Sequence, residues 1–398
     1  MNDSAAASAL IAAAPASSAA AATDAGGLSP CPDPLRHPFR ALGWLVMLVA
    51  GIVSLLVILA VLAAIPGANV LALGYMLEAE GRVARSGRLR DGLPLAGILP
   101  RLGAVAVGTW LWLLVVRLVT QAAVDAALVA PGGGVAMAWE RARIATVVGV
   151  GLHLTAALFA GGTLESFFRP IRNVRLLVRE VRAGTAWSTA AAALEHVLEL
   201  VRPGRLFWLG LRGFLGALAW LVVPTVLFSA LRHTRRPVEI LVTLVGAVLL
   251  AVVLAVVPFM QARFAADPRW RAFGEVAAVR ELYRRAPLAM VTAVVLLYGL
   301  SLPLSLLKVL VPPRDALLFI TPIFVLTIYP ARLVVGWATA YAGRRPRRQW
   351  LAVRAVALLA LLPLMGLFLF LLFLTPTIGA LGRRVLFDHH SLLLPTPF

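Results

Sequence analysis

The sequence predicts an all-α fold, a polytopic integral membrane helix bundle with about eight transmembrane helices. The chain of 398 residues is 61% hydrophobic and 14% charged, whereas soluble domains are about 45–50% apolar and about one-quarter charged. Apolar runs of about 20 residues, the length that crosses a bilayer, recur along the chain. A backbone surrounded by lipid must satisfy its own hydrogen bonds, so these runs should be helical.

The apolar runs divide the chain into one membrane domain, over residues 35–375, and two tails. We expect spanning helices over residues 42–65, 102–124, 144–164, 206–231, 238–259, 288–311, 316–342 and 351–375. Residues 1–34 are rich in Ala, Ser and Pro and lack the pattern of a signal peptide, so a disordered tail is expected. Residues 376–398 are expected to form a polar C-terminal tail. Its adjacent His389 and His390 project differently on a helix and are not expected to bind a metal.

Basic residues between the runs predict the orientation. Arginine supplies all but one of the 37 basic residues, and the net charge is +19. Segments after the first, third, fifth and seventh runs carry twice as many Lys and Arg residues as segments on the opposite side. Basic loops remain cytoplasmic, so we expect residues 66–101 to be the first cytoplasmic loop of a bacterial inner-membrane protein with both termini outside.

Four segments have the pattern of helices that lie in the headgroup layer. In residues 170–182, four arginines share one helical face and Ile and Val form a stripe on another. Residues 267–285 repeat this pattern, with Asp267 as the expected N-cap. Residues 75–88 and 187–201 are expected to form two further interfacial helices. The candidate lipid-headgroup contacts are Arg82, Arg85, Arg172, Arg175, Arg179 and Arg182.

Four polar residues within the runs form a candidate intramembrane site, because ionisable groups in lipid are costly and are often functional. Arg117, Gln121 and Asp125 recur every four residues in the second run and form one stripe. Arg332 lies in the seventh run, which two prolines interrupt. The stripe is either a substrate contact lining a cavity or a packing arginine bound by Gln121 and Asp125, and we favour the packing role.

Several segments carry a resemblance to a known family. They include PGANVLALGYMLEAEGRVARSGRLRDGLPL at residues 66–95, RLGAVAVGTWLWLLVVRL, RPGRLFWLGLRGFLGALAWLVVP, PFMQARFAADPRWRAFGEVAAVRELYRRAP and the closing LLLPTPF. In these segments the chain resembles an uncharacterised family of bacterial polytopic membrane proteins. The first segment is also similar to a broader membrane domain of unknown function. The resemblance covers most of residues 40–398 and implies a multi-spanning helical protein, without an assigned activity or site.

The motifs favour a protein that is not an enzyme. The sequence lacks a Walker loop, HExxH and GxSxG, and its single cysteine, Cys31, excludes a Cys-based metal site. We expect no catalytic residue, metal or cofactor. The expected partners are the lipid bilayer, its anionic headgroups, and other membrane proteins or a second copy of the chain. Nucleic acid is not expected, because the arginines border apolar runs.

Two hypotheses for the function remain. The first is an integral membrane protein that organises lipid or membrane-protein partners through Arg-rich interfacial helices. The alternative is a transporter or permease with a polar site between the second and seventh spans. Residues 73–82 weakly resemble residues 335–344, which fits either a transporter repeat or interface anchoring. Glu78 and Glu80 are expected near the surface, so they do not predict a proton relay, and a lipid-modifying enzyme ranks last.

Overall fold

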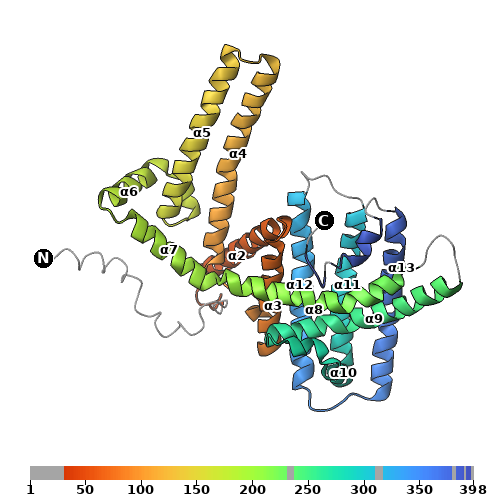
Figure 1. The fold of residues 1–398 in the computed structure, drawn as a ribbon. Coiled ribbons are helices and arrows are strands. Elements are labelled where there is room, and N and C mark those ends of the chain that lie inside the picture. The colour runs from red at the N-terminus through yellow and green to blue at the C-terminus, as the bar shows by residue number, and fades with distance from the viewer. Residues whose placement is uncertain (1–30, 231–236, 310–316, 379–381, 390, 396–398) are drawn as a thin grey trace.

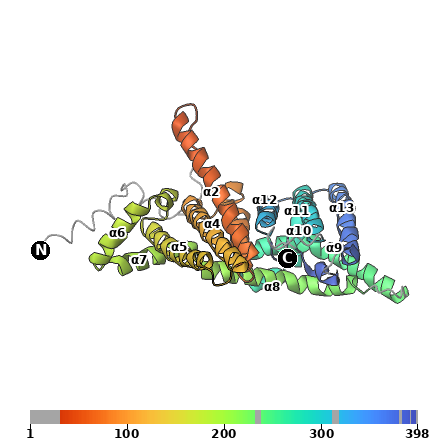
Figure 2. The same cartoon turned by 90° about the horizontal axis from the view of Figure 1, so that it is seen from above.

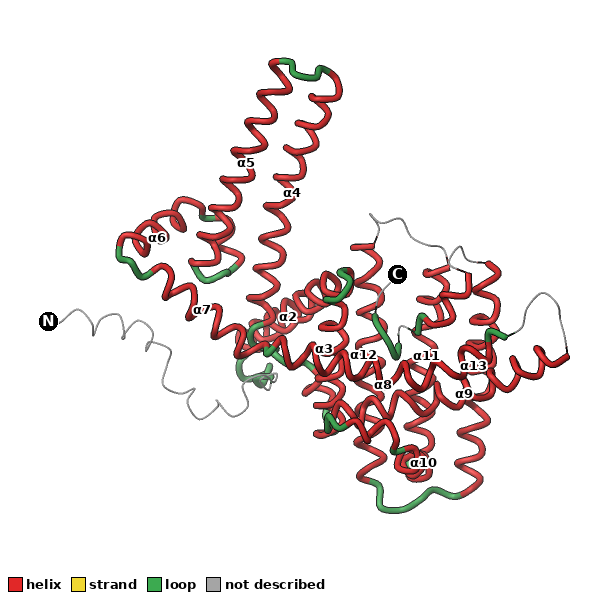
Figure 3. Tube along the Cα trace, viewed as in Figure 1, coloured by secondary structure: helices red, strands yellow, loops and turns green. Residues whose placement is uncertain are grey.

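The structure, a computed structural model, describes residues 31–230, 237–309, 317–378, 382–389 and 391–395. Every regular element in these residues is an α-helix or a short 3-10 helix, and Figure 3 shows the loops between them. Residues 1–30 of the expected N-terminal tail lie outside the described residues, as does His390.

Eight helices in the described part are long and apolar enough to cross a membrane. They are α2 (Pro38–Ala64), α4 (Leu99–Val129), α5 (Gly134–Phe159), α8 (Pro203–Phe228), α9 (Pro237–Ala266), α11 (Pro287–Val309), α12 (Leu317–Arg344) and α13 (Leu351–Ile378). The shorter elements are α3 (Asn69–Ser86), η1 (Leu89–Gly92), η2 (Leu164–Phe168), α6 (Pro170–Arg182), α7 (Ala186–Val201), η3 (Trp270–Gly274), α10 (Val276–Arg285) and η5 (Gly382–Phe387). The all-α membrane architecture predicted from the sequence is confirmed.

The helices form a main body and a projecting hairpin. Figure 1 shows α4 and α5 side by side, extending away from the other spans, with α6 and α7 near the base of α5. In the main body, α8 and α9 pack together and lie across α11, α12 and α13. Figure 2, seen from above, separates the α4–α7 part from this body. Helix α3 packs against α8, α9 and α12 and is therefore central to the main body.

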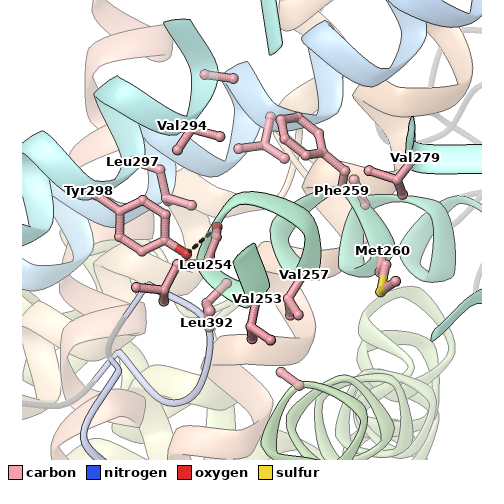
Figure 4. Packing of buried hydrophobic residues seen from close by; sticks show 14 of the residues in the cluster. Val253, Leu254, Val257, Phe259, Met260, Val279, Val294, Leu297, Tyr298 and Leu392 are labelled. Carbon is pink, nitrogen blue, oxygen red and sulfur yellow. Dashed lines mark hydrogen bonds between the residues drawn. The ribbon is translucent and has the colours of Figure 1, made fainter. Parts of the chain in front are cut away.

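The main hydrophobic core surrounds α9. Leu254 and Val257 are fully buried and pack among side chains from α8, α11, α12 and α13. The close view in Figure 4 shows Tyr298 of α11 donating its hydroxyl to the Leu254 carbonyl at 2.8 Å. The hydrogen bond gives the buried tyrosine hydroxyl a polar partner near the middle of α9.

The chain after α13 packs into this core, contrary to the polar tail expected over residues 376–398. Leu392 is fully buried, and His389 is 3% exposed. The buried Gln261 of α9 donates from Nε2 to the Leu392 carbonyl at 2.8 Å and to the Gly213 carbonyl at 3.1 Å. The side-chain amide thus gives the folded-back segment the backbone hydrogen bond that burial requires.

Helix α3 corrects the expectation of a surface loop with an interfacial helix over residues 75–88. The helix is present, but most of its side chains are buried. Its glycines explain the close packing: a Cβ on Gly74 would lie 2.7 Å from the Leu206 carbonyl carbon of α8, with the oxygen nearer still. A Cβ on Gly81 would meet the Ala265 carbonyl of α9 in the same way. Helices approach this closely only where small residues face each other.

The other expected interfacial segments form helices, two of which begin at a different residue than expected. Helix α6 has the predicted bounds, and α7 begins one residue before the expected range 187–201. Helix α10 begins at Val276 and not at residue 268. Asp267 forms an ion pair with Arg269, and the 3-10 helix η3 intervenes, so the Asp267 carboxylate does not cap α10.

Candidate functional site: arginines around two buried carboxylates

Helix α3 brings two carboxylates into the main body. Glu78 is 6% exposed and Glu80 is 1% exposed. Buried carboxylates need charged or hydrogen-bonding partners because removing them from water is unfavourable. Glu78 has three arginine neighbours and Glu80 has one, and these arginines come from α3, α8 and α12.

Glu78 is shared by three arginines. Arg82, one turn later in α3, donates from Nε to Oε1 at 3.1 Å. Arg205 at the start of α8 donates from Nη2 to Oε2 at 2.9 Å. Arg85 Nη2 lies 3.8 Å from Oε1. The candidate headgroup contacts Arg82 and Arg85 are therefore partly committed to an internal carboxylate, and the cluster keeps a net positive charge.

Glu80 pairs with Arg332 of α12. The Arg332 Nη1 atom donates to Glu80 Oε2 at 2.9 Å, and both side chains are almost completely buried. Arg332 Nε and Nη2 are buried without a hydrogen-bond partner among the residues described. Burial raises the pKa of the Glu80 carboxyl to about 7, against the opposing effect of Arg332. The pair joins α3 to α12 and is the most deeply buried charge in this cluster.

Two tyrosines fix the loop that follows α3. Tyr75 of α3 and Tyr329 of α12 stack with ring centroids 6.2 Å apart. Tyr75 donates its hydroxyl to the Pro94 carbonyl at 2.5 Å, and Tyr329 donates to the Gly92 carbonyl. Burial raises the pKa of the Tyr75 hydroxyl well above its usual value, so it remains a proton donor at neutral pH. Residues 89–95 are thereby held against the charged cluster.

A cavity of about 310 Å³, which we call the α7–α8 cavity, lies on one side of α3. Glu78, Arg82 and Arg205 line it. Leu95 and Arg202, which also line it, have φ of 67° and 47°. They are the described non-glycine residues with positive φ, a conformation that costs about 1 kcal/mol or more and often marks functional sites.

A second cavity, the α9–α12 cavity of about 320 Å³, lies between α3, α9, η3, α10 and α12. Its charged lining residues are Arg85, Arg263, Asp267, Arg269, Glu275 and Arg344. Next to it, Arg348 hydrogen-bonds Glu281 of α10 at 2.9 Å. This bond, aided by Arg285, holds the pKa of the Glu281 carboxyl below its usual value. Helix α10 is therefore tied to the basic segment that follows α12.

The residues predicted as an intramembrane site are not brought together. Gln121 donates to Asp125 at 3.1 Å on α4, and these two residues and Arg117 are exposed. Helix α4 packs against α2, α5 and η2, whereas Arg332 is buried in α12 against Glu80. Gln121 and Asp125 contact each other, but no ion pair or hydrogen bond joins the exposed Arg117 to either of them within the described residues, contrary to the packing role expected for it. The second and seventh spans do not share these residues in one site.

The arginines of α6 lie where the pattern placed them, on the surface. Arg172, Arg175, Arg179 and Arg182 are all exposed. By contrast, the sequence does not predict the ion pairs that α3 makes with other helices, Glu78 with Arg205 of α8 and Glu80 with Arg332 of α12. The signal that could have found the buried helix is the pair Gly74 and Gly81, which lie seven residues apart and so share one face of α3.

No family model matches the chain, and no curated protein and no solved structure is significantly similar to it. The resemblance to a family of bacterial membrane proteins therefore remains a prediction. The class that the fold defines is a multi-pass helical membrane protein with internal carboxylate–arginine clusters.

Proposed function

We propose that the protein is a non-enzymatic membrane protein that organises anionic lipid around its helices through the arginine face of α6. The observation that carries this proposal is the exposure of two different faces of one short helix. The four arginines lie on one face, and on another Ile171 is 69% exposed and Val181 is 61% exposed. A helix in water alone would bury this apolar stripe.

A third face of α6 fixes it to the rest of the chain. Asn173 is 1% exposed and donates from its side-chain amide to the Ser166 carbonyl in η2. Helix α6 also packs against α5, a spanning helix. The anchoring face leaves the arginines and the apolar stripe free, so α6 can insert its stripe below the headgroups while its guanidinium groups contact phosphates.

The energy of such a contact is appreciable. Each basic residue near an anionic membrane surface contributes about 1 kcal/mol, so four arginines contribute about 4 kcal/mol at physiological ionic strength. Screening shortens the reach of these charges to about 3 Å at 1 M salt. The proposal therefore requires that the contact weaken as salt is raised.

The test places a nitroxide label on the apolar stripe, as Val178→Cys in a Cys31→Ser background. In bilayers containing phosphatidylglycerol, we expect the label to be accessible to oxygen and protected from a water-soluble nickel complex. Replacing the four α6 arginines with Gln should move the label toward water. Electron paramagnetic resonance power saturation measures both accessibilities.

A matched control removes four arginines outside α6: Arg88, Arg271, Arg280 and Arg347, also replaced with Gln. These side chains are exposed and form no ion pair within the described residues. The label should keep its depth in this control. A label that is equally water-accessible in phosphatidylglycerol and phosphatidylcholine bilayers, before any arginine is replaced, would show that α6 does not lie in the headgroup layer.

A further inference from the structure

The α9–α12 cavity gathers four arginines from four separate segments. Arg85 comes from α3, Arg263 from α9, Arg269 from the loop before η3 and Arg344 from the end of α12. Like charges converge in this way only where anions hold them, because they repel one another. Asp267 and Glu275 supply two of those anions.

The internal ion pairs account for half of the positive charge. Arg263 donates from Nε to Glu275 at 3.1 Å, and Arg269 pairs with Asp267. Of the other two arginines, Arg344 has no carboxylate partner in the described part of the chain. Arg85 lies 3.8 Å from Glu78, a carboxylate that Arg82 and Arg205 approach more closely. The four arginines and two carboxylates that line the cavity carry a net charge of +2, in a space large enough for a phosphate group.

Backbone contacts hold Arg85 and Arg344 in place while leaving donors free. Arg85 donates from Nη1 to the Ala266 carbonyl at 2.9 Å and to the Ala265 carbonyl at 3.2 Å. Arg344 donates from Nη2 to the Ser86 carbonyl. Each guanidinium has five N–H donors, so these bonds use only part of its capacity. A guanidinium oriented by a backbone carbonyl is preorganised for a second, anionic ligand.

The geometry of the walls keeps the cavity open. Gly87 has φ of 68°, and a Cβ there would lie 2.7 Å from Arg344 Cζ, so glycine both permits the left-handed end of α3 and admits the guanidinium. Gly343 lines the cavity itself, and no atom lies within 4 Å of the position its Cβ would take. Small residues therefore leave room next to the two arginines.

We propose that the α9–α12 cavity binds the phosphate of an anionic lipid headgroup, with Arg85 and Arg344 as its ligands. The spanning helices α9 and α12 both end at this cavity, which places it at the depth of headgroups. Basic pockets between spanning helices bind anionic headgroups in this way. The site is separate from α6 and does not depend on the function proposed for that helix.

The test compares two double variants of the protein that lose the same charge from the ends of α3 and α12 or from the residues just after them. Arg85→Gln/Arg344→Gln removes the ligands, whereas Arg88→Gln/Arg347→Gln removes neighbours outside the cavity. Native mass spectrometry of detergent-solubilised protein titrated with phosphatidylglycerol measures the affinity for the first bound lipid. We expect at least about tenfold weaker binding for the first variant and no change for the second.

A third variant leaves every charge in place. Gly343→Leu should fill the cavity and weaken phosphatidylglycerol binding, so that a folding defect of the arginine variant cannot explain the result. The four-arginine α6 variant should retain the tightly bound lipid, which separates this site from that helix. Equal losses in the two double variants, unchanged binding in Gly343→Leu, or equal affinity for phosphatidylcholine would overturn the proposal. Displacement of the lipid by millimolar inorganic phosphate would also overturn it, in favour of a free-phosphate site.

Discussion

Glu80→Leu is expected to destabilise the folded protein by about 3–5 kcal/mol, the usual effect of removing one partner from a buried ion pair. The substitution keeps nearly the same volume but leaves Arg332 buried without a counter-charge. Arginine cannot release its proton in a protein, and two of its nitrogens already have no partner among the residues described. Arg332 therefore keeps a buried, unpaired positive charge in this variant.

The reverse variant, Arg332→Met, should be milder and should depend on pH. The lone Glu80 can take up a proton, and its pKa is raised to about 7 even beside Arg332. A carboxyl with a folded pKa above its unfolded value, about 4.3, stabilises the fold at low pH and loses that contribution as pH rises through the folded pKa. Without Arg332 the folded pKa rises further, so stability should fall more steeply from pH 6 to pH 8 than in the parent.

Unfolding in mixed SDS and detergent micelles, followed by tryptophan fluorescence, measures both variants. The double variant Glu80→Leu/Arg332→Met should recover most of the loss, since a buried ion pair replaced by apolar groups is often neutral. Single variants that are each within 1 kcal/mol of the parent, with no coupling in the double variant, would show that the Glu80–Arg332 pair is not buried as described.

The spans and α6 follow from the sequence because their signals are local. A run of about 20 apolar residues and a helical face of arginines at three- and four-residue spacing are each contained in one segment. The bounds 170–182 are those of α6. The burial of α3 does not follow from its own sequence, because its charged residues indicate a surface position. Arg205, which pairs with Glu78, lies 127 residues away in the chain. The ion pair that stabilises the buried Glu78 carboxylate therefore cannot be predicted from the residues around it.

The candidate site also contains one contact that is predictable from the sequence and one that is not. Gln121 and Asp125 are four residues apart, and their contact is predictable from helical spacing alone. Arg332 is unusual as an arginine within an apolar run, but its partner Glu80 lies 252 residues away. Pairing across such a distance depends on how α3 and α12 pack, which hydrophobic periodicity does not specify.

The second large effect on stability is expected at Gly74, where α3 packs against α8. Gly74→Ala should destabilise the protein by about 3 kcal/mol or more, at or above the upper end for overpacked cores. The new Cβ would meet the Leu206 backbone of α8, and Gly210 approaches Val70 equally closely from the other side. Backbone atoms cannot rotate away, so α3 and α8 must separate. The matched control is Gly299→Ala in α11, where the Cβ meets nothing within 4 Å and helix propensity predicts a gain of about 1 kcal/mol.

The separation of α3 from α8 should also reach the charged cluster, because Glu78 binds Arg205 near the same contact. In the Gly74→Ala background, Arg205→Gln should therefore have a smaller effect than in the parent, and a double-mutant cycle measures the difference. If Gly74→Ala were as harmless as Gly299→Ala, α3 could not be seated on the α8 backbone. The two buried carboxylates would then lack the close helix contact that holds them beside their arginines.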